Sequence, residues 1–344
     1  MSGGVDSSVA AALLRRDGHE VIGVNMRVKG DRHDTAGDKD IEDARHVADK
    51  LDIPFHVVDF RDTFEAEVIK PFAEAYAQGI TPNPCIVCNR KIKFGLFAQK
   101  ARELGATHIA TGHHARVVLH EGRNMIAAGH DPDRDQSYFL FTLTHDDLEF
   151  VRFPVGELTK PEVRRIAEQM ALGVAQKAES REVCFVPDDK YVNLVEQYAD
   201  ETVAPGEIVL SDGRAVGRHD GVHRFTVGQR RGLNVALGRP MYVLSIDAPG
   251  RKVTIGGKEE CRSKGLVARE LVWNYYRFSE ENMEVEVRIR YRTRPVKAII
   301  SPLEGNRAKV VFTDLTPLVT PGQAAVFYRG ETVLGGGWIE KPIK

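Results

Sequence analysis

The chain has 344 residues, of which 42% are hydrophobic and 28% charged, a composition typical of a globular protein with room for two or three domains. Its formal net charge is −1, so a polyanionic partner must bind a local basic patch and not a generally basic surface. The sequence has no apolar run long enough to span a membrane and no secretory signal pattern. We therefore expect a cytoplasmic protein without a membrane partner, in which the four cysteines are reduced.

The first half of the chain alternates between helix and strand patterns. Apolar residues recur at helical or strand spacing in seven segments, residues 9–16, 20–26, 44–51, 55–60, 64–76, 90–104 and 108–111. Strands separated by helices of this length predict parallel pairing, and therefore a doubly wound α/β sheet. Ligands of such sheets bind at the carboxyl ends of the strands, where we expect the functional site.

The second half has the short alternating strands and turns of antiparallel β structure. Residues 284–292, EVEVRIRYR, alternate strictly, which predicts one strand with Val285, Val287, Ile289 and Tyr291 on one face. The same alternation would place Arg288, Arg290 and Arg292 in one row, a pattern that fits phosphate contacts. We expect three domains: a doubly wound domain at 1–195, a small β-rich domain at 196–266 and an antiparallel β-barrel at 267–344.

The N-terminal sequence SGGVDSS has the composition of a phosphate-binding loop. Gly3 and Gly4 let the backbone approach an anion closely, and Ser2 and Ser7 add hydroxyl groups. A helix that begins near Asp6 would direct free N–H groups and its positive dipole end at the anion. The loop is not a Walker A motif, because no lysine follows the glycines. The alternative is a flexible tail that caps an ordinary helix.

The segment TPNPCIVCNRKIKFG contains two of the cysteines. Pro82 and Pro84 predict a rigid turn that presents Cys85 and Cys88, and a following helix with nearby cations would favour their thiolate forms. Cys-x-x-Cys also occurs in zinc sites, in redox pairs and, with Cys184 as a third ligand, in iron–sulfur centres. Taken alone, Cys184 and Cys261 are more typical of inert buried thiols.

The order of these motifs resembles the tRNA-specific 2-thiouridylases of the PP-loop ATP pyrophosphatase superfamily, a HUP-like fold. The resemblance covers almost the whole chain. It is carried by SGGVDSS, TPNPC-x-x-CN-x-x-IKF, ATGHHAR, DQSYFL, FPVGELTKPEVR, EVCFVP, GRHDGVHRFTVGQRRGL, RIRYR, PGQAAVFY and LGGGWIE. In the superfamily the loop follows the first, central strand of the sheet. The resemblance therefore implies a short apolar strand upstream of Met1.

The resemblance also implies an activity. Members use ATP, with Mg²⁺, to adenylate the 2-oxygen of the wobble uridine at position 34 of tRNA, and then replace that oxygen with sulfur. Cys184 matches the cysteine that carries the sulfur as a persulfide, which a sulfur-donor protein supplies. Cys88 matches the second catalytic cysteine, which can release sulfide or close a disulfide with Cys184.

Binding residues follow from the same resemblance. The ATP site corresponds to Met1, Ser2, Gly3, Gly4, Val5, Asp6, Ser7, Met26 and Gly112. The tRNA contacts correspond to Asn83, Pro84, Cys85, His113, Arg134, Asp135, Gln136, Arg290, Tyr291 and Gln323. Many members have an aspartate where Cys85 stands. With Cys85 in place of a carboxylate, an acid/base role at that position is in doubt. An iron–sulfur cluster held by Cys85, Cys88 and Cys184 is the alternative hypothesis.

Two other functions remain open from the sequence. Another PP-loop adenylating enzyme, such as an amidating synthetase, would need neither the cysteine pair nor a basic barrel. An RNA-binding protein with a degenerate nucleotide site would not bind ATP.

Overall fold

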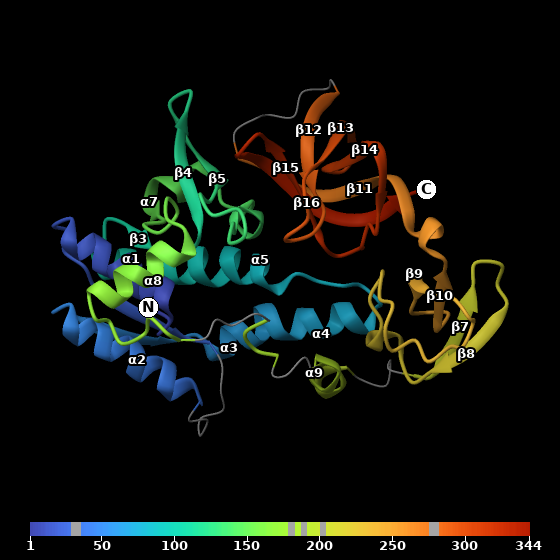
Figure 1. The fold of residues 1–344 in the computed structure, drawn as a ribbon, viewed down its shortest axis with the longest axis horizontal. Helices are drawn as coiled ribbons and strands as arrows, with labels where there is room; N and C mark the ends of the chain where they lie inside the picture. The colour runs from blue at the N-terminus through green and yellow to red at the C-terminus, as the bar shows by residue number, and fades with distance from the viewer. Residues whose placement is uncertain (29–35, 178–182, 187–190, 200–203, 275–281) are drawn as a thin grey trace. The chain divides into compact units, whose positions relative to one another are not determined.

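The computed structural model describes residues 1–28, 36–177, 183–186, 191–199, 204–274 and 282–344 (Figure 1). Contacts within the chain divide it into two units. The first unit comprises Met1–Val68, Cys85–Phe185 and Glu331–Val333, and the second comprises Ile69–Pro84, Val186–Gly330 and Leu334–Lys344. Among the helices described, none is both long and apolar enough to cross a membrane.

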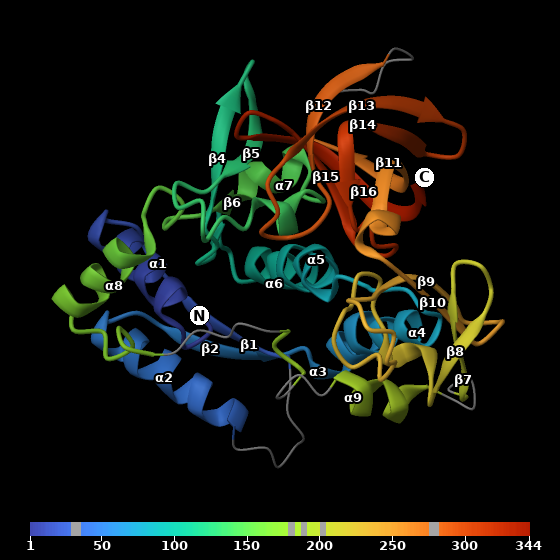
Figure 2. The same ribbon diagram turned by 45° about the vertical axis from the view of Figure 1, so that its right-hand side comes forward.

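Parallel strand pairs form the centre of the first unit. Strand β1 (Gly23–Arg27) pairs in parallel with β2 (Phe55–Asp59), and β3 (Ile109–Ala110) with β6 (Val151–Arg152). Helices α1 (Val5–Arg16) and α2 (Ala36–Lys50) lie near the β1–β2 pair, as Figure 2 shows, and both contribute to one hydrophobic core. The predicted doubly wound α/β fold is confirmed.

Small side chains let the helices of the first unit pack closely. The core includes Val9 and Ala12 of α1, Val47 and Ala48 of α2, and Ala167 of α8 (Lys160–Gln169), and all five are essentially inaccessible to solvent. Helix α8 begins with a capping box between Thr159 and Glu162, which satisfies backbone N–H groups at its start. This packing brings the start of α8 near the start of α1.

The two predicted helices at 64–76 and 90–104 exist, and each contains a π-helical segment. The first region comprises α3 (Arg61–Phe64), the π-helix η1 (Glu65–Ile69) and α4 (Lys70–Ala77). The second comprises α5 (Pro84–Cys88), the π-helix η2 (Asn89–Leu96) and α6 (Phe97–Glu103). Such π-helical segments are rare and occur frequently at functional sites.

The prediction that Cys85 and Cys88 lie on a turn before a helix is wrong. Both cysteines lie within α5, whose first residue is Pro84. Proline is favoured at the first helical position, because its missing N–H has no partner there and its φ already suits the helix. Pro84 therefore starts the helix one turn earlier than the sequence pattern indicates.

The remaining elements of the first unit are short. They are β4 (Ala115–His120), β5 (Arg123–Ala128), the 3₁₀-helix η3 (Ser137–Leu140) and α7 (His145–Phe150). Strands β4 and β5 form an antiparallel hairpin, and Thr332 at the start of β16 pairs with Ala127 of β5.

The first part of the second unit is a four-stranded sheet with its own core. Its strands, in spatial order, are β8 (Ala215–His219), β7 (Gly206–Leu210), β10 (Lys252–Gly256) and β9 (Tyr242–Asp247). The core includes Ile208, Val243, Val253 and Ile255, which are almost fully buried. Helix α9 (Tyr191–Tyr198) and the 3₁₀-helices η5 (Val222–Arg224) and η6 (Lys258–Cys261) complete this part.

Six antiparallel strands form the predicted C-terminal barrel, which is confirmed. They are β11 (Arg262–Trp273), β12 (Met283–Arg288), β13 (Val296–Leu303), β14 (Arg307–Pro317), β15 (Ala324–Arg329) and β16 (Thr332–Ile343). The order is β11-β14-β13-β12-β15-β16, and pairing of β11 with β16 closes the barrel.

The predicted row of three arginines on one strand is wrong. Val285, Val287 and Ile289 are buried as expected, but β12 ends at Arg288, so Tyr291 lies in the turn beyond the strand and is only half-buried. Arg290 lies in the bend beyond it, and Arg292 has a left-handed φ of 62° in the following turn. The guanidinium of Arg288 lies 4.6 Å from the centre of the Tyr328 ring, so this arginine is engaged within the barrel.

Tryptophan fluorescence reports on the barrel, because both tryptophans of the chain, Trp273 and Trp338, lie in its strands. Ile300 is fully buried, whereas its neighbour Ile299 is on the other face of β13 and 39% exposed. We expect Ile300→Ala to lower the free energy of barrel unfolding by about 2–5 kcal/mol, because it leaves a cavity. Ile299→Ala, the matched control, should cost less than about 1 kcal/mol.

Tryptophan fluorescence during urea unfolding measures both variants. Equal losses of stability at positions 299 and 300 would contradict the strand orientation described for β13.

Candidate active site

The N-terminal loop has the geometry of an anion site at a helix N-terminus. Gly3 has a φ of +71°, and a Cβ there would lie 2.3 Å from the carbonyl oxygen of Asp40, so only glycine fits. Gly4 is the N-cap of α1 and has no side chain that could cap the helix. The backbone N–H groups of the first turn are therefore available to an anion.

Serine hydroxyls and Met1 fix the shape of this loop. The hydroxyls of Ser7 and Ser8 donate to the carbonyl oxygen of Gly4 at 3.1 and 2.9 Å, and the backbone N–H of Ser2 donates to Ser7 Oγ at 3.1 Å. The amino group of Met1 donates to the carbonyl of Val24, and Asn25 Nδ2 donates to the carbonyl of Met1 at 2.8 Å. These two hydrogen bonds hold the start of the loop beside β1, the strand that contains Met26.

Gly112 lies directly against the start of α1. A Cβ at this position would be 2.5 Å from the backbone nitrogen of Ser7 and 2.6 Å from the carbonyl carbon of Asp6. Gly112 follows β3 by two residues, so the end of this strand reaches the phosphate loop only because it has no side chain. The structure brings these predicted ATP-site residues together.

Asp6 is the centre of a half-buried charge cluster at the loop. Lys160 Nζ donates to both of its carboxylate oxygens at 2.7 and 2.8 Å, and His114 Nε2 lies 3.2 Å from Oδ1. Burial alone would raise the pKa of Asp6, but the hydrogen bonds from His114 and Lys160 and their charges hold it below its usual value. Asp6 is therefore an anion that is neutralised by a buried lysine.

His113, the neighbour of His114, faces the cysteines. Its Nδ1 lies 2.7 Å from Thr111 Oγ1, and its Nε2 lies 3.4 Å from Lys93 Nζ. Burial, with the charges of Lys93 and His114, lowers the pKa of His113 well below its ordinary value. His113 is therefore neutral at physiological pH. The two adjacent histidines connect the phosphate loop to the segment that carries the thiols.

Three thiols lie close enough for their charges to interact. Cys85 and Cys88 are three residues apart in α5 and therefore on one side of the helix. Cys184 lies in a short described segment, where the ring of Phe185 packs edge-on against the ring of Phe64 at 5.6 Å. A negative charge on Cys184 would raise the pKa of both Cys85 and Cys88. Cys184 is exposed, whereas the other two are half-buried.

The prediction that the helix terminus and cations favour thiolates is wrong for the helical pair. Burial raises the pKa of Cys85 to about 11 and also raises the pKa of Cys88. Lys93 opposes this effect at both thiols, but it does not outweigh the loss of hydration. Lys91 is instead paired with Glu67 on the surface. Cys261 is buried in the second unit.

The predicted tRNA-contact residues at 134–136 have different environments. Asp135 is only 3% exposed, and its carboxylate accepts hydrogen bonds from the backbone N–H groups of Gly129 and Ser137 and from the Ser137 hydroxyl. Gln136 Oε1 accepts from the N–H of His114 at 2.9 Å. Arg134 lies in the preceding turn. Asp135 and Gln136 thus hold the loop that positions the histidines.

Other predicted contacts belong to the second unit. Gln323 Nε2 donates to the carbonyl oxygens of Thr81 and Pro82 at 3.0 and 3.2 Å. These bonds hold the segment that leads through the buried Asn83 to Pro84. Arg290 is exposed, and Tyr291 lies under the guanidinium of Arg292, 5.3 Å from ring centre to Cζ.

The sequence analysis missed two lysines in the site. Lys160 was present within the motif FPVGELTKPEVR, but nothing in its spacing indicates a partner 154 residues away. Lys177 pairs with Asp40 at 2.9 Å and with Asp43, beside the carbonyl that faces Gly3. Within the described ranges, no three or more His, Cys, Asp and Glu side chains form a group that could hold a metal ion.

Three family models match successive parts of the chain. Residues 1–188 match the model described as tRNA methyl transferase HUP domain, and residues 193–257 the tRNA methyl transferase PRC-barrel domain. Residues 263–339 match the Aminomethyltransferase beta-barrel domain.

Relatives of similar length carry one common name, tRNA-specific 2-thiouridylase MnmA. The protein of that name from Geobacter metallireducens is 49% identical over 99% of this chain and 95% of its own length. The one from Geotalea uraniireducens is 49% identical over 100% of this chain and 94% of its own. The one from Syntrophotalea carbinolica is 47% identical over 98% of this chain and 97% of its own.

The different environments of the thiols predict an order of chemical modification. We expect iodoacetamide to alkylate Cys184 first, because it is exposed. Cys85 should remain unmodified near pH 7.5 and react increasingly towards pH 11, because only the thiolate is nucleophilic and burial raises its pKa to about 11. Peptide mass spectrometry after timed labelling measures each site. Rapid labelling of Cys85 at neutral pH would contradict the burial described here.

Proposed function

Because this chain belongs to the family of tRNA-specific 2-thiouridylases, we propose that it replaces the 2-oxygen of a tRNA uridine with sulfur in an ATP-dependent reaction. One observation carries the proposal beyond the family name: the phosphate loop, the histidine pair and three thiols lie in one unit. Their neighbouring placement fits a reaction that first activates an oxygen and then delivers sulfur to the same carbon. The wobble uridine, position 34, is the proposed target.

The first step activates a poor leaving group. The 2-oxygen of uridine attacks the α-phosphate of ATP, and pyrophosphate leaves. The free N–H groups at the start of α1 suit the pyrophosphate, and Gly112 keeps the adjoining strand end close without blocking it. Mg²⁺ would enter with the ATP phosphates, where it neutralises charge.

The second step delivers sulfur from a persulfide on Cys184. The terminal persulfide sulfur attacks C2, and the C2–O bond breaks so that AMP leaves with the original oxygen. Cys88, as thiolate, then attacks Sγ of Cys184. The bond between that Sγ and the transferred sulfur breaks, and its electron pair stays with the sulfur on C2. The products are 2-thiouridine and a Cys88–Cys184 disulfide, which a cellular thiol reductant must reduce before the next cycle.

Proton control at Cys88 follows from its surroundings. Burial raises the pKa of this thiol, so Cys88 is protonated in the free protein at neutral pH. Lys93 is the cation that opposes this effect, and it is held near the thiols by its contact with neutral His113. A thiol that is protonated until substrate binds would not reduce the Cys184 persulfide prematurely.

The exposure of Cys184 suits loading by a second protein. A sulfur-donor protein that carries a persulfide needs access to only this thiol, which is exposed. The proposed tRNA contacts remain Asn83, Pro84, Cys85, His113, Arg134, Asp135, Gln136, Arg290, Tyr291 and Gln323. An iron–sulfur cluster on Cys85, Cys88 and Cys184 is not supported by the geometry of the described residues, and we route no step through it.

Nucleoside analysis by mass spectrometry tests the function. Unmodified tRNA is incubated with ATP, a persulfide source and the protein. We expect 2-thiouridine with the wild type, and at least a hundredfold less with Cys184→Ser, because the sulfur carrier is lost. Cys88→Ser should stop the reaction after AMP release and leave the tRNA attached to Cys184, because S–S cleavage is blocked.

The control is Cys261→Ser, which changes a buried thiol in the second unit and should retain activity. Cys85→Ser decides whether this residue has an acid/base role, since an unchanged rate would exclude one. Pyrophosphate release without tRNA would favour an adenylating enzyme for a small molecule. Absence of ATP binding would favour an RNA-binding protein.

We propose that Lys160 neutralises the negative charge of Asp6, which would otherwise repel the phosphates of bound ATP. Lys160→Met leaves the Asp6 carboxylate beside the phosphates with His114 as its remaining partner, so its negative charge is less well neutralised and we expect ATP to bind at least about tenfold more weakly. The double variant Asp6→Asn/Lys160→Met removes both charges and should recover most of this loss. Equilibrium dialysis with ATP measures both. A double variant as weak as the single one would contradict the neutralising role and would indicate direct contact of Lys160 with ATP.

A further inference from the structure

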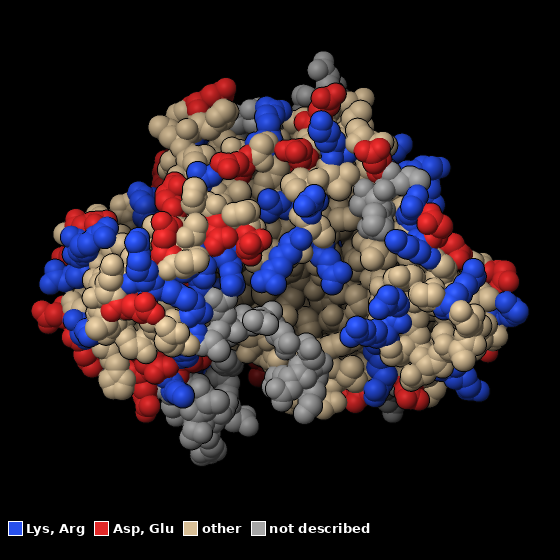
Figure 3. Space-filling view, in the orientation of Figure 1, with Lys and Arg blue, Asp and Glu red and all other residues tan. Residues whose placement is uncertain are grey.

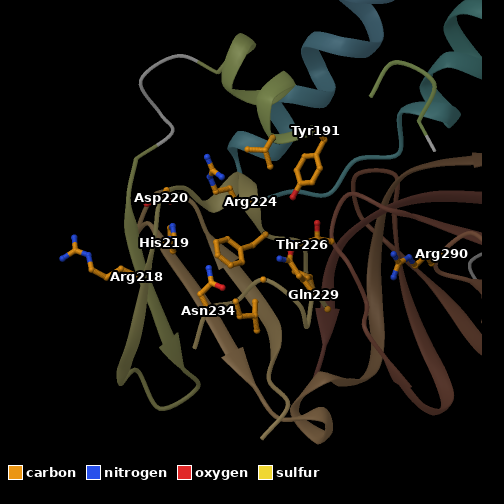
Figure 4. A pocket seen from close by; sticks show the side chains of 15 residues that line it. Tyr191, Arg218, His219, Asp220, Arg224, Thr226, Gln229, Asn234 and Arg290 are labelled. Carbon is orange, nitrogen blue, oxygen red and sulfur yellow. Dashed lines mark hydrogen bonds between the residues drawn. The ribbon is translucent and has the colours of Figure 1, made fainter. Parts of the chain in front are cut away.

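The second unit contains a cavity that the proposed reaction does not use. Its volume is about 700 Å³, within the usual range of about 300–1,000 Å³ for small-molecule sites. Residues from the start of α9, the end of β8, the loop at 224–234 and the bend after β12 line it (Figure 4). All of them belong to the second unit.

The loop at 226–234, sequence TVGQRRGLN, forms one wall and is held in a defined shape. Gly228 and Gly232 have φ values of +94° and +73°, which favour glycine. Gln229 Oε1 accepts from the N–H of Thr226, and its Nε2 donates to the carbonyl of Arg231, each at 3.0 Å. The Gln229 side chain therefore supports the loop and is not available to a ligand.

An aromatic ring forms a second wall. Figure 4 shows Tyr191 at this wall, whereas the ring of Phe225 is only 5% exposed and packs edge-on against His219 in the core of the sheet. The ring of Tyr191 packs against that of Tyr76 at 4.7 Å, which limits its movement. Such a fixed ring is suited to stack against a planar group.

Four polar side chains at the cavity remain available. Within the described part of the chain, Arg218, Asn234 and Arg290 make no side-chain hydrogen bond or ion pair. Figure 4 shows Arg218 and Arg290 at opposite sides of the cavity, with Asn234 between them. Arg224, by contrast, is paired with Glu196 at 2.6 Å. Asp220, an exposed carboxylate at the cavity, likewise makes no side-chain hydrogen bond or ion pair within the described residues, so the available groups are two cations, one amide and one carboxylate.

The surroundings are basic although the whole chain is not. A second hollow shares Gly232, Leu233 and Asn234 with the cavity and is lined by Arg230 and Arg239. Figure 3 shows Lys and Arg side chains predominating over the part of this face that contains β7–β10. Asp220 is the acidic residue that lines the cavity itself. In a chain of net charge −1, this concentration of arginines indicates an anionic ligand.

We propose that this cavity binds a ribonucleotide, with the base against Tyr191, the Asn234 amide at the base edge and the phosphate at Arg218 or Arg290. Planar aromatic surface, an amide and arginines are the groups that proteins use for unstacked nucleotides. The same chemistry could come from an unpaired nucleotide of the tRNA or from a free nucleotide. The tRNA source rests on the proposed function.

Binding measurements on the full chain test the proposal. The variants are Arg218→Ala and Asn234→Ala, both at exposed positions, with Arg214→Ala as the matched control. Arg214 is an exposed arginine of the same sheet region that lines neither hollow. The ligands are unmodified tRNA and uridine 5′-monophosphate, the latter chosen because it lacks the adenine of ATP.

We expect Arg218→Ala to weaken tRNA binding about tenfold and Asn234→Ala about fivefold, with Arg214→Ala within twofold of wild type. In steady state, the two cavity variants should raise KM for tRNA and leave kcat unchanged. Loss of uridine monophosphate binding with unchanged tRNA binding would support a free nucleotide as the ligand.

The proposal is overturned if both cavity variants match Arg214→Ala with both ligands. Failure of the proposed function is a separate result, because then the wild type itself would form no 2-thiouridine. In that case the uridine monophosphate measurement still decides whether the cavity takes a nucleotide.

Discussion

The site depends on the close approach of the strand end at Gly112 to the first turn of α1. With no Cβ at this position, backbone lies against backbone, and the next two residues are placed on either side of the junction. His114 reaches Asp6 of the phosphate loop, and His113 reaches Lys93 beside the thiols. Any side chain at position 112 would separate the N-terminal loop from the segment that contains the thiols.

Local patterns predicted the elements well, because periodicity reports which face of an element is buried. The alternation of Val285, Val287 and Ile289 identified the inner face of β12. The same pattern could not show where that strand ends, because the turn at Arg292 depends on a left-handed backbone that arginine does not signal. Pro84 was similarly ambiguous, since proline suits both a turn and the first position of a helix.

Properties that depend on contacts between distant parts of the chain could not be predicted from the sequence. The cations near Cys85 and Cys88 indicated lowered thiol pKa values, but burial by the folded chain dominates and raises them. Asp6 and Lys160 are far apart in sequence and meet only because α1 packs beside α8. The family resemblance identified the loop and the cysteines. It did not indicate the lysine that neutralises Asp6 or the arginine-rimmed cavity of the second unit.

The contrast between one exposed and two half-buried thiols also sets the order of damage under oxidative stress. A small oxidant meets Cys184 before it meets Cys85 or Cys88. A sulfenic acid formed there has Cys88 within electrostatic range, and condensation of the two would give a disulfide and water. That product is the same state in which the proposed catalytic cycle ends. Under the proposed mechanism, the reductant that resets each turnover would therefore also reduce this disulfide. Irreversible oxidation of Cys184 would then be limited without a separate repair system.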